Sequence, residues 1–209
     1  MRRFAPLALL TIAALAAPVV AQMTMPTEAP GKFDPKLAKS GKYKIDPFHT
    51  QALFTVNHLG FTEYTGQFTN PTGSLTLDTK TLANSKVDVT FPIDKVRTTV
   101  GELDTHLAAA TLFDVAKFPT ATFVSTRVTK TGASTANITG NLTIRGVTKP
   151  VILHARFVGA GQEFWGDKKD AIGFAATVSV KRSDFGLSDS IPLVSDKVDL
   201  TINAGFTAE

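Results

Sequence analysis

The sequence predicts an all-β domain with one helical insert, either a sandwich or an up-and-down barrel. From Tyr43 onward, apolar and polar residues alternate in short runs that turn-forming residues separate, which is the pattern of half-buried strands. The apolar faces of these runs are long and rich in phenylalanine, of which the chain has 15, against two tyrosines and one tryptophan. Such faces favour the barrel, because a small barrel either packs its interior or holds one ligand there. Composition alone favours the packed interior.

Length and charge limit the functions that the chain can have. It has 209 residues, of which 43% are hydrophobic and 19% charged, as expected for one globular domain. The formal net charge is +4, and it falls to +2 if Arg2 and Arg3 are removed with a leader. An excess this small and evenly spread argues against nucleic acid as a partner. The chain has no cysteine, so thiol nucleophiles, thiolate metal sites and a lipidated cysteine are excluded.

The first residues predict an exported protein. Residues 1–21 combine two arginines with an apolar run over 4–17 and small residues before the end, so we expect a signal peptide cleaved after about Ala21. The apolar run is short for a membrane span, and an uncleaved anchor is the less favoured alternative. Residues 22–42 contain several prolines and glycines and little periodicity, so we expect a flexible leader there. The β domain then covers residues 43–208.

Four short strands are expected before the insert. Alternation predicts them around residues 51–57, 64–69, 75–77 and 86–91. Residues 70–73 read Asn-Pro-Thr-Gly, a sequence that favours a turn. The last of these runs has one clean apolar face, and Pro92 ends it.

A helix is expected near residues 100–116, because the hydrophobic period changes there. Thr98 or Thr99 could cap it, and Glu102 lies where a capping-box acid belongs if Thr99 is the cap. The apolar positions are four and three residues apart, as on one face of a helix: Leu103, Leu107 and Ala110.

Strands return after Pro119 and end in the last residues of the chain. Within them, the stretch 140–151 reads as a strand, a tight turn and a second strand. Gly146 allows the positive φ of the turn, and Pro150 fits only at the first residue of a strand or on an edge. The strands expected in this part lie at residues 121–128, 136–145, 151–158, 172–181 and 198–206. Together with those before the insert, the chain is expected to form eight or nine strands.

The sequence shows no convincing catalytic or metal-binding pattern. His106 with Glu102 and Asp104 could hold a metal from a helix, but an acidic, solvated helix face explains these residues more simply. A Gly-x-Ser-x-Gly nucleophile elbow and a glycine-rich phosphate loop are both absent. We therefore assign no catalytic residue, no metal and no cofactor.

Several segments, taken in order, resemble the YceI-like family of exported bacterial lipid-binding proteins. The most distinctive is residues 140–151, Gly-Asn-Leu-Thr-Ile-Arg-Gly-Val-Thr-Lys-Pro-Val. The resemblance spans Tyr43 to about Phe206. The other segments that carry it are residues 46–50, 54–61, 66–68, 103–107, 112–119, 123–126, 182–186 and 194–198.

The resemblance implies an extended, eight-stranded, antiparallel, lipocalin-like barrel with a helix packed by one opening. It also implies a periplasmic carrier, not an enzyme, that holds a long isoprenoid such as a polyprenyl phosphate or a quinone tail, or a fatty-acid-like chain. Two alternatives stay open at this point. One is a quinone-linked redox partner or enzyme of the envelope, and the other is a packed structural barrel without a ligand. A homodimer is compatible with strand edges beside the opening, although no apolar stripe argues for one.

On this resemblance we expect ten apolar side chains to line a tunnel. Leu107 and Phe113, from the helical insert, would form a lid or stopper. His58, Arg145 and Arg182 could contact a phosphate head group at the mouth, or they could serve as hydrogen-bond donors that fix turns. The other expected lining residues are Phe54, Val56, Phe91, Phe123, Leu142, Ile144, Phe174 and Val178.

Overall fold

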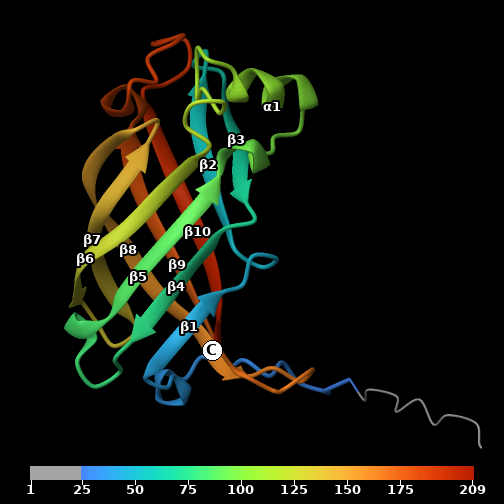
Figure 1. Cartoon of the computed structure of the whole chain (residues 1–209), viewed down its shortest axis with the longest axis vertical. Coiled ribbons are helices and arrows are strands. Elements are labelled where there is room, and N and C mark those ends of the chain that lie inside the picture. The colour runs from blue at the N-terminus through green and yellow to red at the C-terminus, as the bar shows by residue number, and fades with distance from the viewer. Residues whose placement is uncertain (1–24) are drawn as a thin grey trace, which may run out of the picture.

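The computed structural model describes residues 25–209, and the expected signal peptide lies outside the described residues. Within that part of the chain, ten strands form one antiparallel sheet in the order β1-β4-β5-β6-β7-β8-β9-β10-β2-β3 (Figure 1). A further pairing of β1 with β10 closes it into a barrel. The strands are β1 (Gly41–Ile45), β2 (Gln51–His58), β3 (Thr62–Thr69), β4 (Thr72–Leu77), β5 (Lys86–Pro92), β6 (Thr120–Lys130), β7 (Thr135–Ile144), β8 (Val147–Gln162), β9 (Asp170–Lys181) and β10 (Lys197–Ala208).

Two of the barrel's strands are each interrupted once, which reconciles the ten segments with an eight-stranded barrel. β1 and β2 both pair with β10, at Ile45↔Phe206 and Gln51↔Asn203, so they are consecutive parts of one strand. β4 pairs with β1 and β3 pairs with β2, so β3 and β4 are the two parts of the neighbouring strand. The prediction of a closed, antiparallel, eight-stranded barrel is therefore confirmed.

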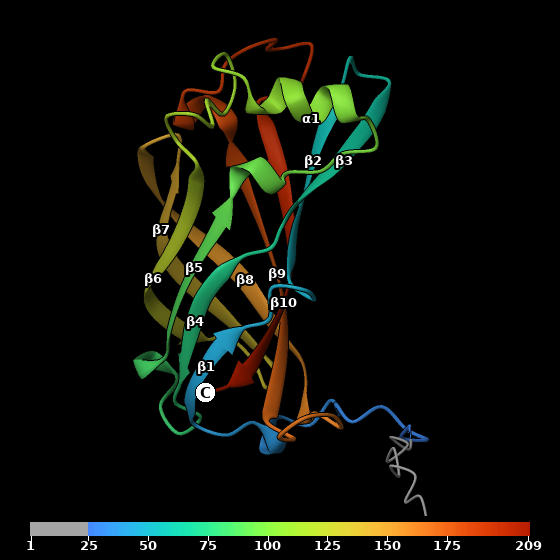
Figure 2. The same cartoon turned by 45° about the vertical axis from the view of Figure 1, so that its right-hand side comes forward.

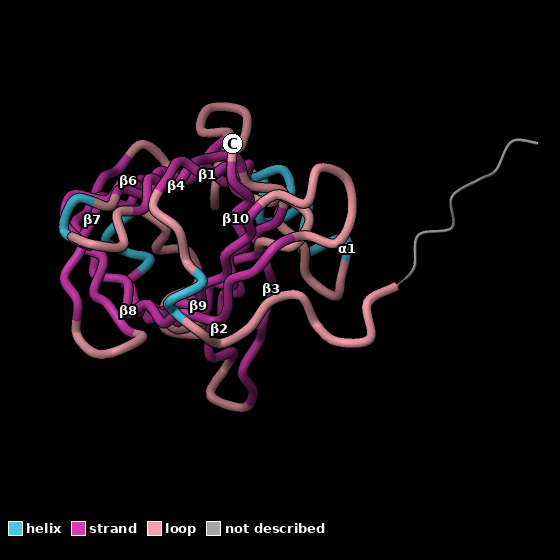
Figure 3. Tube along the Cα trace, turned by 90° about the horizontal axis from the view of Figure 1, so that it is seen from below, coloured by secondary structure: helices cyan, strands magenta, loops and turns pink. Residues whose placement is uncertain are grey.

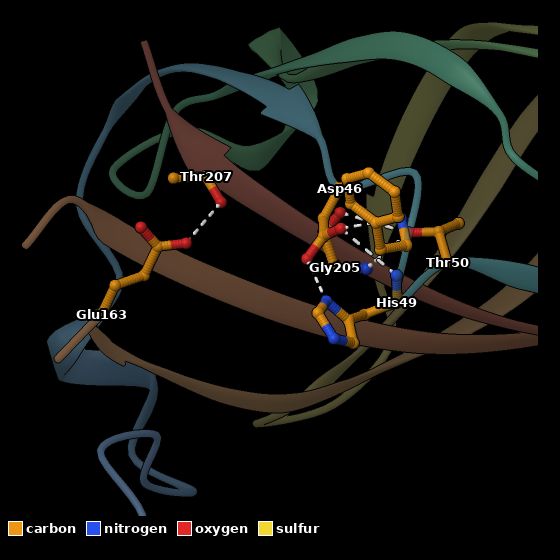
Figure 4. Close-up of polar contacts among 7 residues, drawn as sticks. Asp46, His49, Thr50, Glu163, Gly205 and Thr207 are labelled. Atoms are coloured by element: carbon orange, nitrogen blue, oxygen red, sulfur yellow. Dashed lines mark hydrogen bonds and ion pairs between the residues drawn. The ribbon is translucent and has the colours of Figure 1, made fainter. Parts of the chain in front are cut away.

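A local hydrogen-bond network holds the break between β1 and β2 (Figure 4). The Asp46 carboxylate accepts from the backbone N–H of Phe48 at 2.9 Å and of His49 at 3.2 Å, and it contacts His49 Nδ1 at 2.6 Å. The buried Thr50 hydroxyl accepts from the N–H of Gly205 at 3.0 Å. These bonds fix the residues between the two strands in a turn, so the strand changes direction at a defined point.

The hairpin between β7 and β8 has the two-residue turn that the sequence indicates. Arg145 and Gly146 have φ values of 50° and 74°, and two successive positive φ values define a type I′ turn. Pro150 lies opposite Asn141 in the β7–β8 ladder, whereas β8 pairs with β9 only from His154 onward. Pro150 therefore has a free edge on the β9 side, as expected for a residue without an N–H.

The helical insert covers one end of the barrel, called the upper end here (Figure 2). α1 runs over Gly101–Ala108, shorter than the expected 100–116, and turns make up the rest. The expected capping box is wrong, because Val100 is the N-cap and it has no side chain that can accept a hydrogen bond. Instead, the Asp104 carboxylate accepts from the N–H and the hydroxyl of Thr98, at 2.6 and 2.7 Å.

The opposite, lower end holds the packed part of the interior. A buried cluster there joins side chains from β1, β4, β5, β8, β9 and β10, among them Tyr43, Ile45 and Phe206. Most residues of this cluster also border the space inside the barrel, so the cluster forms the lower part of its wall. Four short 3₁₀ helices complete the described chain: η1 (Pro35–Leu37), η2 (Leu82–Asn84), η3 (Ile93–Lys95) and η4 (Arg182–Phe185).

Part of the segment expected to be a flexible leader contacts the barrel. The Lys32 N–H donates to the Ala160 carbonyl at 3.0 Å, and the Ala160 N–H donates back at 3.1 Å. The Phe33 ring lies 5.8 Å from that of Phe157. Seen from below, the leader with η1 crosses the lower end of the barrel (Figure 3). It covers the edge of β8 beyond the point where the β7 ladder begins.

Gly161 is the residue that lets the leader approach this edge. A Cβ at Gly161 would lie 2.2 Å from the Pro30 carbonyl oxygen, a backbone atom. We predict that Gly161→Ala detaches the leader, so that the Lys32 amide exchanges its hydrogen at least about tenfold faster. Amide hydrogen exchange checks this, with Gly31→Ala as control, since a Cβ there meets nothing within 4 Å. Unchanged protection at Lys32 in the Gly161 variant would contradict the assignment.

Candidate functional site

The barrel encloses one large apolar cavity with a volume of about 790 Å³. This volume lies within the range of roughly 300–1,000 Å³ that small-molecule sites occupy. Along β10, every second residue from Val198 to Phe206 lines it, a stretch of about 26 Å at the rise of a β-strand. The interior is therefore hollow over much of its length, in contrast to the packed interior that composition favoured.

All ten side chains expected to line a tunnel lie in the wall of this cavity. Leu107 of α1 and Phe113 of the turn after it form part of the wall at the upper end. That these residues contact a ligand stays a prediction. The other eight, Phe54, Val56, Phe91, Phe123, Leu142, Ile144, Phe174 and Val178, come from the strands β2, β5, β6, β7 and β9.

The sequence reasoning missed part of the wall. β10 contributes a full inward-facing row, yet none of its residues was chosen, although alternation marked residues 198–206 as a strand. That alternation was the signal that could have found them. The row on β10 consists of Val198, Leu200, Ile202, Ala204 and Phe206.

Aromatic contacts connect the wall to the segment that covers the upper end. The ring centroids of Phe54 and Phe68 are 5.5 Å apart, and those of Phe68 and Phe113 are 5.8 Å apart, edge to face. Such pairs stabilise by about 0.5–1.5 kcal/mol beyond the area that they bury. The turn after α1 is therefore held against the strands by aromatic contacts in the cavity wall, in addition to its covalent connection along the chain.

Arg145 holds three upper-end segments together through backbone carbonyls. Its guanidinium donates to Gly186 O at 2.7 Å and to Ala110 O at 3.0 Å. It thus ties the β7–β8 turn to the end of η4 and to the turn after α1. Of the two roles considered for this residue, the geometry favours the turn-fixing one.

Arg182 fixes the long connection between η4 and β10 in the same way. It donates to the carbonyls of Leu187 at 2.7 Å, Val194 at 2.9 Å and Ser195 at 2.9 Å. Burial lowers the pKa of this guanidinium from its ordinary value. The side chain borders the cavity, but its N–H groups are directed at the loop, so a structural role is again favoured.

A hydrogen-bonded turn accounts for Ser183, beside Arg182. The Ser183 N–H and hydroxyl both donate to the Asp196 carboxylate, at 2.8 Å each. These bonds lower the pKa of Asp196, the backbone bond being the larger cause. The Ser183 hydroxyl thus serves as a donor that closes the loop.

The remaining polar groups of the upper end include two histidines. His58, at the end of β2, lines the cavity, and so does His106 of α1, for which the sequence favoured a place on a solvated helix face over a metal site. Tyr64 lines it as well, and its hydroxyl lies 3.1 Å from that of Thr99. Groups that could contact a polar head group therefore gather at this end, from β2, β3 and α1.

Two further features of residues 25–209 bear on the site. They contain no cluster of three or more His, Asp or Glu side chains placed to hold a metal ion. In the same part of the chain, no helix is both long and apolar enough to cross a membrane.

Sequence comparison identifies the family of this barrel. A family model described as the YceI-like domain matches residues 43–206. The chain belongs to the YceI-like family. Protein YceI of Salmonella arizonae is 41% identical over 168 residues, which cover 79% of this chain and 86% of that protein. The resemblance seen in the sequence is thus confirmed.

Solved structures show the same YceI-like barrel. The Campylobacter jejuni YCEI protein is 31% identical, with a TM-score of 0.65 over 73% of this chain and 90% of that one. A polyisoprenoid binding domain from Saccharophagus degradans has a TM-score of 0.61 over 80% of this chain and 98% of that one. At 14% identity, this second likeness concerns the fold alone.

The Arg182 contacts lead to a stability prediction. Arg182→Met retains an apolar stem but removes the donors to three loop carbonyls, so we expect the free energy of unfolding to fall by about 3 kcal/mol. Urea denaturation measures the change, with Arg127→Met on the exposed face of β6 as the matched control. A loss of less than about 1 kcal/mol would contradict the clamp assigned to Arg182.

Proposed function

We propose that the protein is a periplasmic carrier that holds one long isoprenoid chain inside the barrel. The observation that carries the proposal is the apolar cavity, whose wall consists of alternate residues from strands all around the barrel. The alternative of a packed structural barrel without a ligand predicts no such space. Membership of the YceI-like family supports the proposal, and so does the likeness to a domain described as polyisoprenoid binding.

The dimensions of the cavity suit a chain-like ligand. The lined stretch of β10 measures about 26 Å along the strand, and a carbon chain advances roughly 1.3 Å per bond when extended. About 20 chain bonds therefore fit along this stretch. A longer chain would have to fold back inside the barrel or emerge at an end.

Burial of the chain supplies the binding free energy. Each methylene-sized group removed from water stabilises the complex by about 0.8 kcal/mol. Ordering the chain and restricting the protein oppose this gain, so the net affinity stays well below the sum. Affinity would then follow the length of the buried chain, whereas the polar groups near His58 and His106 would influence the choice of head group.

The expected export of the protein is consistent with a carrier function. The features of residues 1–21 support secretion through the inner membrane, and long isoprenoids are too apolar to cross an aqueous compartment unaided. A protein that encloses the chain would keep it out of water during that passage.

Intact mass measurements on protein from its native periplasm test the proposal. We expect extra mass under native conditions that is lost on denaturation, together with an isoprenoid in the organic extract. Protein with only the bare mass would then be incubated with polyprenyl phosphate and with ubiquinone, and failure to bind either would refute the carrier function. A bound straight acyl chain in place of an isoprenoid would refute the ligand class.

A charge in the wall should abolish binding. We predict that Phe123→Glu lowers the affinity for polyprenyl phosphate by at least about 100-fold, because a carboxylate in the cavity must be desolvated when the chain enters. Val124→Glu is the matched control, since Val124 is 43% exposed and neighbours Phe123 on the outer face of β6. Native mass spectrometry measures binding, and circular dichroism verifies the fold. A folded Phe123→Glu protein with unchanged affinity would remove Phe123 from the ligand-contacting wall.

A further inference from the structure

Two glycines face the interior of the barrel at positions where large side chains would otherwise stand. Gly66 lies on β3 between Tyr64 and Phe68, which both line the cavity. Gly140 lies on β7 between Ile138 and Leu142, which line it as well. Because alternate residues of a strand share a face, both glycines point inward. Neither lines the cavity itself, although both are buried, so other atoms cover them.

A phenylalanine ring covers each glycine. A Cβ at Gly66 would lie 2.4 Å from Cζ of Phe54, its direct partner in the β2–β3 ladder. A Cβ at Gly140 would lie 2.4 Å from Cζ of Phe123, its diagonal neighbour across the β6–β7 ladder. Both rings line the cavity. Each ring therefore occupies a niche in the wall that exists only because the residue beneath has no side chain.

The two niches act on the same internal space from different sides. β2 and β3 form one side of the barrel, and β6 and β7 lie across from them (Figures 1 and 3). Non-bonded carbon atoms prefer a separation of about 3.5–4.0 Å, so a methyl group at either glycine would displace the ring by roughly 1 Å or more. Displaced rings would stand further into the cavity, so each substitution would reduce the space open to a ligand beside its ring.

We propose that Gly66 and Gly140 determine ligand specificity by recessing Phe54 and Phe123, so that the passage admits methyl-branched chains of the isoprenoid class. A straight acyl chain is narrower than a chain that carries methyl branches, and it passes a constriction that the branches cannot. This inference rests on the proposed carrier function and names the feature of the ligand that the wall recognises. The glycines act through the rings and touch no ligand.

Gly66→Ala is the cleaner substitution of the two. Its new methyl group meets mainly the far end of the Phe54 ring, which can swing, and a backbone oxygen of Arg97 only at 3.0 Å. At Gly140, the carbonyl oxygen of Val124 lies 2.7 Å from the new methyl group and cannot move as freely. The Gly66 variant therefore narrows the passage with the least disturbance of the barrel.

The test compares two synthetic ligands that differ only in branching. Phytanyl phosphate and n-hexadecyl phosphate have the same saturated main chain and the same head group, but phytanyl carries methyl branches. Delipidated mature protein is titrated with each below its micelle-forming concentration, and binding is followed by native mass spectrometry. The variants are Gly66→Ala, Phe54→Leu and the double variant, with Gly173→Ala as the matched strand-glycine control, because a Cβ there has 3.8 Å of space.

For Gly66→Ala we expect phytanyl phosphate to bind about tenfold more weakly, with n-hexadecyl phosphate changed by about twofold or less. The double variant should restore phytanyl binding, since a leucine side chain in place of the Phe54 ring is shorter and leaves room for the methyl group. Gly173→Ala should change neither affinity. Phe54→Leu alone should raise the preference for phytanyl about threefold, which keeps the inference testable if Gly66→Ala fails to fold.

Two results would overturn the inference, and both can be distinguished from the result that would refute the carrier function. If the unmodified protein binds both phosphates but the folded Gly66→Ala protein weakens both equally or neither, the niches do not select branching. A Phe54→Leu protein with an unchanged preference leads to the same conclusion. If the unmodified protein binds neither phosphate, the proposed carrier function itself falls, and the inference falls with it.

Discussion

An eight-stranded barrel is only just wide enough for its own inward-facing side chains to fill it, so a cavity exists only where those side chains are held against the wall. This constraint governs the arrangement of the interior. At the lower end the side chains of β1, β4, β8 and β10 meet and form the packed cluster. The rings of Phe54 and Phe123 lie over glycines, and a cavity remains inside the wall that they help to form. The same apolar side chains thus form the buried cluster at the lower end and line the space inside the barrel.

Both ends of the barrel must be covered, because an open apolar lumen would be exposed to water or would attract other apolar surfaces. At the lower end the chain uses its own leader, paired with β8 through Lys32 and Ala160. At the upper end it uses α1 and the connection after η4, held by Arg145 and Arg182. The lower closure is therefore an isolated backbone bridge of two hydrogen bonds, whereas the upper one depends on arginine side chains that donate to backbone carbonyls.

The alternation of the sequence predicted most of the strands and the apolar face of each, whereas the expected tunnel lining depended on the resemblance to the family and omitted the inward row of β10. It worked because a barrel that is apolar inside and wet outside imposes a strict period of two on every strand. The type I′ turn at Gly146 followed from local chemistry in the same way. The helix was overestimated in length, since the apolar residues beyond Ala108 contact the cavity from turns, and spacing alone does not distinguish the two.

Other features depended on contacts between residues far apart in the chain. Arg145 and Arg182 were expected either to contact a head group or to fix turns, and nothing local indicates that Arg182 meets the carbonyl of Val194. The leader looked flexible because its partner, the edge of β8, is more than a hundred residues away. The niche at Gly66 exists because the β2–β3 register sets that glycine opposite Phe54, and a shift by one residue would remove it.

The clamp formed by Arg182 has a consequence for how this barrel can diversify. Its three acceptors are main-chain oxygens, which every residue possesses whatever its side chain. The side chains of residues 188–194 are consequently not needed as partners of this clamp, whereas Leu187 is buried and the Ser195 hydroxyl itself bonds to the Asn57 N–H and the Lys197 carbonyl. Substitutions at residues 188–194 leave the carbonyl acceptors of Arg182 in place, so the chemistry presented at the mouth can change towards new cargo while the path of the loop is retained.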